Sequence, residues 1–320
     1  MILSEDLAKK IRYIQIYTNK AVDDSLAGEY ESVFKGSGME FDEAREYYPG
    51  DDVRNIDWNI TARMGKPYIK RFSEERELTV LLMVDMSRSG IFSSSEKSKN
   101  DFAAELCALL AFAATKNNDK IGLLLFADKV TKFIAPKKGT SHVLKIIREL
   151  LTYKDSIENN AKKSWFKKIC RILFPWAEYT PPIENNTDIA SALDYVGHVL
   201  KKKAVIFLVS DFQANNFENS MRITAQRHDL IAVSITDQRE MELPNIGIIT
   251  LEDAETGESV TINTSNKKIR EDYLSQNIMK KEQLKHLFAS MHVDLIDLNS
   301  QQDYVHEIMK FFLARAKKHR

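Results

Sequence analysis

Five oxygen-bearing side chains stand in three separate segments of the sequence, two of which directly follow apolar runs. These residues are Asp85, Ser87, Ser89, Thr187 and Asp211. The apolar runs lie at 78–84 and 204–209, and continuous apolarity over such a length is typical of strands buried on both faces of a sheet. Because ligands collect beyond the carboxyl ends of the strands in an open α/β sheet, we expect the three segments to meet at one edge.

Mg²⁺ is the ion that this set of side chains would hold best, although Mn²⁺ or Ca²⁺ would also accept these ligands. Mg²⁺ takes six oxygen ligands at roughly 2.0 to 2.1 Å, usually one or two carboxylates together with hydroxyls and waters. In an extended turn, residues two apart point to the same side, so Asp85, Ser87 and Ser89 can face one ion together. The alternative is that Ser87, Ser89 and Thr187 are only helix caps and turn formers.

An enzymatic interpretation takes Asp85 as the nucleophile of a haloacid-dehalogenase-like phosphatase, in which an aspartate also follows the first strand. Such enzymes place a second aspartate two residues later, where this chain has Ser87. The sequence contains no phosphate-loop, dinucleotide-binding or nucleophile-elbow glycine motif. We therefore expect a binding protein without an active site of its own.

Alternating strand and helix patterns position these residues. Strands are predicted at 78–84, 121–126, 204–209 and 230–235. Helical periodicity between them lies at 101–115, 141–151 and 188–200. This alternation predicts an α/β fold with a doubly wound, mostly parallel sheet.

Three parts of the chain are expected from these patterns. Residues 1–76 form a small N-terminal accessory module of strands and turns, and residues 77–240 form the main domain. Residues 241–320 complete that domain with a β-hairpin at 246–263, a closing strand and helices. A Lys- and aromatic-rich insertion at 153–186 interrupts the main domain.

A motif in the first part of the chain resembles that of a known family. The run REYYPGDDVR at 45–54, the Ile56-Asp57-Trp58 and Thr61-Ala62-Arg63 segments, and the text LEDAETGE at 251–258 are similar to the bacterial domain-of-unknown-function family numbered 58, DUF58. The five oxygen-bearing residues also resemble, position by position, the metal-ion-dependent adhesion site of von Willebrand factor A domains.

The resemblance implies a von Willebrand A fold, which is Rossmann-like, and an association with MoxR-type AAA+ ATPases. Those ATPases are thought to act as chaperones that mature or remodel client proteins. The resemblance implies no established enzymatic activity. We expect a metal-dependent adaptor in which an acidic side chain of the partner completes the Mg²⁺ shell.

Two segments outside the metal loops are candidates for partner binding. Arg54, Trp58 and Arg63 form a docking face in one interpretation, because Trp and Arg are favoured at interface hot spots. In the other interpretation, the arginines pair with neighbouring carboxylates and so stabilise a module that lacks a large core. Trp165 and Phe166 belong to a basic amphipathic stretch at 160–178 that could fill a partner's groove, lie on an anionic membrane or pack on its own domain.

The overall composition limits the classes of partner and compartment. Because 46 Lys and Arg balance 46 Asp and Glu, no global attraction to nucleic acid or anionic membrane is expected. The two cysteines lack metal-ligand spacing and suit a reducing compartment. No run of 18 apolar residues and no signal peptide is found, so we expect a cytoplasmic protein. The Ser-rich segment 92–100 is expected to be solvated.

Overall fold

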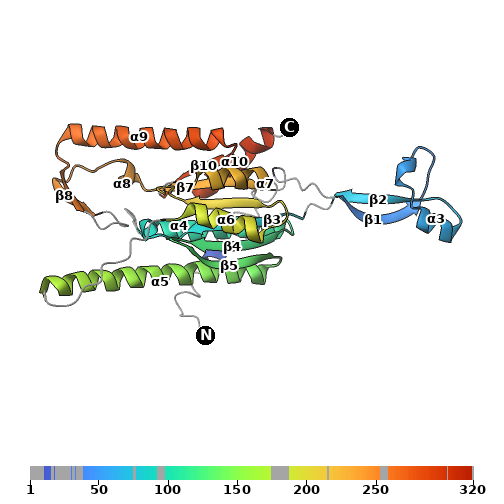
Figure 1. Cartoon of the computed structure of the whole chain (residues 1–320), viewed down its shortest axis with the longest axis horizontal. Helices are drawn as coiled ribbons and strands as arrows, with labels where there is room; N and C mark the ends of the chain where they lie inside the picture. Colours follow the sequence, from blue (N-terminus) through green and yellow to red (C-terminus); the bar gives the residue numbers. More distant parts are fainter. Residues whose placement is uncertain are drawn as a thin grey trace. The chain divides into compact units, whose positions relative to one another are not determined.

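The computed structural model divides the chain into two compact units. The described residues are 11–15, 18, 30, 33, 39–74, 77–91, 98–173, 187–214, 216–252, 259–300 and 302–318, and for 39–43, 71–74, 88, 91 and 157–173 only the backbone is considered. One unit is Phe34–Leu78, and the other comprises Met1–Val33 with Thr79–Arg320. Figure 1 shows the elements of each unit. None of the described helices is both long and apolar enough to cross a bilayer.

A six-stranded sheet forms the centre of the larger unit. Its strands are β3 (Thr79–Asp85), β4 (Lys120–Phe126), β5 (Val130–Lys137), β6 (Val205–Ser210), β7 (Asp229–Thr236) and β10 (Asp294–Asn299). Their order is β10-β7-β6-β3-β4-β5, and every neighbouring pair is parallel except β4 and β5. This topology confirms the predicted α/β fold with a mostly parallel sheet.

Helices cover both faces of this sheet (Figure 1). They include α4 (Lys99–Lys116), α5 (Thr140–Leu173), α6 (Ile189–Val199), α7 (Glu218–Arg227), α9 (Lys267–Ser290) and α10 (Tyr304–Lys318). On one face, Leu81 and Leu208 are fully buried in a cluster that includes Leu193 of α6, Met221 of α7 and Phe288 of α9. Because side chains alternate along a strand, Leu82 faces the other side.

The structure differs from the sequence analysis at two elements of the larger unit. The edge strand β5 was not predicted, because its exposed and buried residues are mixed and no continuous apolar run marks it. The helix predicted at 141–151 continues to Leu173 as α5, so the first part of the expected insertion extends an existing helix. Residues 174–186 of that insertion lie outside the described residues.

The segment before residue 34 groups with the larger unit, whereas the sequence analysis assigned residues 1–76 to one module. Tyr30 is fully buried, and its ring packs edge-on against Phe312 of α10 at a centroid distance of 5.9 Å. At the other end of the sequence, β8 (Ile248–Glu252) and β9 (Ser259–Asn263) pair as the predicted antiparallel hairpin.

The smaller unit is a two-stranded antiparallel ribbon with a helical excursion. Its elements are β1 (Met39–Glu46), η2 (Val53–Asn55), α3 (Trp58–Met64) and β2 (Tyr68–Glu74). Asp57 caps α3 by accepting hydrogen bonds from the N–H groups of Asn59 and Ile60. Arg45 donates to Asp51 at 2.7 Å, and the same carboxylate accepts from the N–H of Tyr48. The carboxylates of the charged motif therefore organise its turns and its helix start.

Leu208→Ala tests how much the buried core of the sheet contributes to the stability of the larger unit. Leu208 lies in the fully buried part of β6, so we expect the free energy of unfolding to fall by about 2 to 5 kcal/mol. Ile223→Ala, at an exposed position of α7, should change it by no more than about 0.5 kcal/mol. Urea unfolding followed by far-ultraviolet circular dichroism measures both, and equal effects would contradict this assignment of the core.

Candidate metal centre

The candidate site lies where two neighbouring parallel strands end. Asp85 is the last residue of β3 and Ser210 is the last residue of β6, and Asp211 follows directly. The chain passes from β3 to β4 on one side, and β6 lies on the other side of β3. The gap between β3 and β6 is therefore the point where the strand order reverses, which is where open α/β sheets bind ligands.

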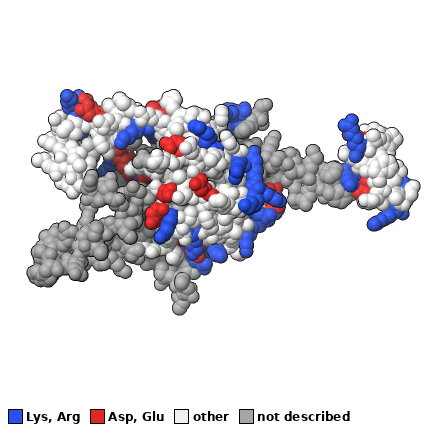
Figure 2. All heavy atoms as spheres, viewed as in Figure 1, with Lys and Arg blue, Asp and Glu red and all other residues white. Residues whose placement is uncertain are grey.

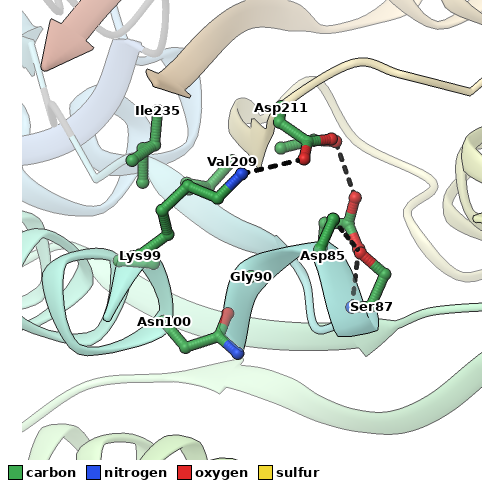
Figure 3. Close-up of a pocket in the computed structure, with 11 residues that line it drawn as sticks. Asp85, Ser87, Gly90, Lys99, Asn100, Val209, Asp211 and Ile235 are labelled. Atoms are coloured by element: carbon green, nitrogen blue, oxygen red, sulfur yellow. Dashed lines mark hydrogen bonds and ion pairs between the residues drawn. The ribbon is translucent and has the colours of Figure 1, made fainter. Parts of the chain in front are cut away.

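A cavity of about 20 Å³ opens at this edge (Figure 3). It is lined by Asp85, Ser87, Ser89, Gly90, Lys99, Asn100, Ala103, Val209, Ser210, Asp211 and Ile235. A volume of this size holds about one water molecule. The enclosed part of the cavity therefore matches a single small ion or water.

Asp85 is held in place by two hydrogen bonds. The N–H of Ser87 donates to its Oδ1 at 2.9 Å, and the hydroxyl of Ser210 donates to its Oδ2 at 2.7 Å. Burial and the nearby charge of Asp211 raise the pKa of Asp85 to about 6, although both hydrogen bonds oppose this change. The carboxylate is thus fixed in position and short of positive charge.

Lys99 supplies a positive charge to the second carboxylate. Its ammonium lies 3.2 Å from Oδ2 of Asp211 and 2.7 Å from Oε1 of Glu240, and its side chain is only 4% exposed. Burial lowers the pKa of Lys99, but the charges of Asp211 and Glu240 outweigh this effect and leave that pKa above its ordinary value. Figure 3 shows Lys99 reaching toward Asp211, with Asp85 and Ser87 on the other side of the cavity.

Lys99 was not among the predicted site residues, because it lies in the Ser-rich segment 92–100, which was expected to be solvated. That expectation was wrong for Lys99 and Asn100, which are both buried. The helix α4 begins here because Ser98 and Asp101 form a capping box. The Ser-x-x-Asp pattern of Ser98 and Asp101, directly before the apolar run of α4, is a signal that could have predicted a helix start at 98–101 in place of a loop.

Asn100 contributes a polar group that is not satisfied within the described part of the chain. Its Nδ2 is buried and has no hydrogen-bond partner there, and the residue lines the cavity. A Cβ on Gly90 would come within 2.2 Å of the Asn100 side-chain oxygen, so a larger residue at this position would force the Asn100 amide to move. A buried amide of this kind is usually satisfied by a water or another polar group.

Four of the five predicted metal ligands come together in this cavity, namely Asp85, Ser87, Ser89 and Asp211. The hydroxyls of Ser87 and Ser89 lie 2.8 Å apart. Thr187 does not line the cavity. It is half-buried beside Asp188, the N-cap of α6, whose N–H donates to the carbonyl of Ala127 just after β4. The role of Thr187 stays a prediction.

The donors present fit a hard divalent cation. Two carboxylates and three hydroxyls line a cavity that is large enough for one ion, and oxygen is the ligand that Mg²⁺ prefers. Within the described residues, no three His, Cys, Asp or Glu side chains form a cluster able to hold a metal. Hydroxyls and water would therefore have to complete the coordination, and the bond from Lys99 to Asp211 would compete with it.

The predicted partner-binding residues lie in other parts of the structure. Trp58, Arg54 and Arg63 are exposed in the smaller unit, and Trp58 retains 70% of its surface. The backbone of Trp165 and Phe166 belongs to α5, and their side chains lie outside the described part of the structure. Both surfaces stay predictions.

The raised pKa of Asp85 predicts a pH-dependent stability in the absence of metal. Because the value of about 6 lies above the ordinary 3.8, the folded protein keeps a proton that the unfolded chain releases. This contribution is fully present below about pH 4 and is lost as the pH rises through 6.

In chelator, the free energy of unfolding of the wild type should therefore fall by up to about 3 kcal/mol relative to Asp85→Asn between about pH 4 and pH 7.5. Urea unfolding at a series of pH values measures the difference. Parallel pH profiles for the two proteins would show that Asp85 is not the perturbed group.

Two solved structures were found to be similar to this chain at low identity. The protein BatB from Bacteroides thetaiotaomicron is 12% identical with a TM-score of 0.41, and the match covers 75% of this chain and 99% of that chain. The VWA domain of SpRpn10 is 10% identical with a TM-score of 0.37, and the match covers 73% and 94% of the two chains.

The similarity in sequence is more extensive. An uncharacterized protein of Mycobacterium tuberculosis is 26% identical over 312 residues, which covers 97% of this chain and 90% of that protein. An uncharacterized protein of Mycobacterium bovis is similar to the same extent. The family model described as "Protein of unknown function DUF58" matches residues 43–283. Because this match spans more than half of the chain and includes the charged motif and both strand ends of the site, the chain belongs to the DUF58 family.

Proposed function

We propose that this protein is a Mg²⁺-dependent adaptor that binds an acidic side chain of a partner at the β3–β6 edge. The observation that carries the proposal is the cavity in which side chains from two neighbouring strand ends converge. When bound, the ion would supply a positive charge with an open position for a carboxylate. Asp85 and Asp211 would hold the ion, and the hydroxyls of Ser87 and Ser89 would add oxygen ligands.

The residues around the cavity favour binding over catalysis. Asp85 is fixed by the Ser87 N–H and the Ser210 hydroxyl, so its remaining lone pairs are aimed before any ligand arrives. Within the described lining, no His stands beside Asp85 to act as a general base. A haloacid-dehalogenase-like phosphatase would also carry a second aspartate two residues after Asp85, where this chain has Ser87.

The resemblance in the charged motif suggests the class of partner. We propose a MoxR-type AAA+ ATPase, with a client protein as a second partner. The smaller unit offers a further contact surface, because Tyr48, Val53, Trp58 and Met64 each retain at least 60% of their surface. Figure 2 shows Lys and Arg atoms around a largely uncharged surface on this unit. Such a surface would suit an acidic, partly apolar partner segment.

Metal binding is tested by thermal unfolding of the wild type and Asp85→Ala with and without Mg²⁺. At 100 times the dissociation constant, the ion should stabilise the wild type by about 2.7 kcal/mol, because it relieves the repulsion between Asp85 and Asp211. Asp85→Ala should lose this response. Asp194→Ala, which removes an exposed carboxylate of α6, should keep it.

If Asp85→Ala responds to Mg²⁺ as the wild type does, the ion binds elsewhere. If the purified wild type hydrolyses p-nitrophenyl phosphate in Mg²⁺ and Asp85→Ala does not, the phosphatase interpretation replaces the adaptor.

Partner binding is tested with an immobilised MoxR-type AAA+ ATPase from the same organism. Because the ATPase needs Mg²⁺ for its own nucleotide, Asp85→Ala removes the metal site more cleanly than a chelator does. We expect Asp85→Ala to weaken binding at least about tenfold and Trp58→Ala to weaken it by a similar factor. Ile223→Ala, which removes an exposed apolar side chain of α7, is the matched control. Unchanged binding by both test variants would contradict the proposed partnership.

A further inference from the structure

Lys99 is a buried cation in the same cavity as the candidate metal ligands. It is 4% exposed and donates to Asp211 of the site and to Glu240 of α8 (Gln238–Met241). Burying an ammonium is costly unless carboxylates compensate its charge. Its place beside a predicted metal ligand therefore requires an explanation.

Among the described residues at the cavity, the carboxylates outnumber the single ammonium of Lys99. Asp85, Asp211 and Glu240 bring three carboxylates, and Lys99 brings one ammonium. The ammonium bonds to Oδ2 of Asp211, and Oδ1 of the same residue accepts only a long 3.4 Å bond from the N–H of Gln213. A divalent ion at Asp211 and the ammonium of Lys99 would thus approach the same carboxylate.

Glu240 is the firmer of the two anchors of Lys99. Its bond to the ammonium is 2.7 Å long, against 3.2 Å for Asp211. Its other carboxylate oxygen accepts from the N–H of Asp237 in a capping box, and its carbonyl accepts from Tyr273 and Asn277 of α9. Lys99 can therefore stay bound to Glu240 when Asp211 turns to another cation.

We propose that Lys99 is a built-in competitor of the divalent cation at Asp211, and that Glu240 holds the lysine when the metal binds. This inference rests on the proposed metal site. Without metal, the ammonium offsets the charge of Asp211 and keeps the site folded. With metal, it retreats to Glu240, so the chain itself sets how tightly the ion is bound.

The test is a titration of Mn²⁺ against four forms of the whole chain by isothermal calorimetry. They are the wild type, Lys99→Gln, Glu240→Gln and the double variant. Lys99→Gln should bind Mn²⁺ at least about tenfold more tightly, because Asp211 is released. Glu240→Gln should bind it several-fold more weakly, because the lysine is left with Asp211 alone. Glutamine can still accept from the Asp237 N–H, so the capping box is kept.

The double variant separates this mechanism from a general change in charge. If Glu240 acts by holding Lys99, Glu240→Gln should have no effect once Lys99 is absent, so the two changes are not additive. Additive effects would mean that each charge acts on the metal independently, which contradicts the competition. Lys281→Gln is the control, because it also removes a lysine that pairs with an aspartate, Asp297, and neither of these residues lines the cavity.

A wrong metal site and a wrong role for Lys99 give different results. If no form binds Mn²⁺, the metal site itself is wrong. If all forms bind it equally, the metal site stands and the role of Lys99 is wrong. Should Lys99→Gln fail to fold, Glu240→Gln still decides, because equal or tighter binding by that variant contradicts the proposal.

Discussion

The carboxylates of Asp85, which is buried, and Asp211, which is half-buried, lie where neighbouring parallel strands end, and their repulsion must be offset in every folded state of the protein. Three means are available to the chain. Asp85 can keep a proton up to a pH of about 6, Lys99 can pair with Asp211, or a divalent cation can bind both carboxylates. The proposed function depends on the divalent cation. Protonation of Asp85 and pairing of Lys99 with Asp211 describe the protein without metal.

The parallel sheet is what brings these groups to one edge. The strand β6 is buried along its whole length and β3 from Val80 onward, so their register is fixed and their last residues must lie side by side. The same edge carries the start of α4, where the Ser98 and Asp101 capping box turns Lys99 and Asn100 inward. Glu240 of α8 then connects the cavity to α9 through Tyr273 and Asn277. Local capping and sheet topology therefore build the site together.

Much of this arrangement could be predicted from the sequence, because it depends on local signals. Apolar runs marked β3, β4, β6 and β7, and polar residues directly after two of them placed Asp85, Ser87, Ser89 and Asp211 in one cavity. The charged motif of the smaller unit likewise indicated a module with turns. In the structure, Asp51 and Asp57 accept backbone hydrogen bonds at a turn and at the start of α3.

What could not be predicted depends on contacts between distant residues. Lys99 lies in a polar, Ser-rich segment, and its burial depends on partners 112 and 141 positions away. The edge strand β5 has no continuous apolar run, because several of its residues, such as Thr131 and Lys132, are exposed to solvent. The extent of α5 is a further case, because the Lys- and aromatic-rich composition after residue 153 indicated an insertion and not the continuation of a helix.

The central claim is that one cation lies between Asp85 and Asp211, and anomalous scattering from crystals grown with Mn²⁺ tests it most directly. The account predicts an anomalous peak in the cavity at the β3–β6 edge, at roughly 2 Å from oxygens of Asp85 and Asp211 or of the waters that link them to the ion. An empty cavity at saturating Mn²⁺, with Lys99 still bonded to Asp211, would contradict it.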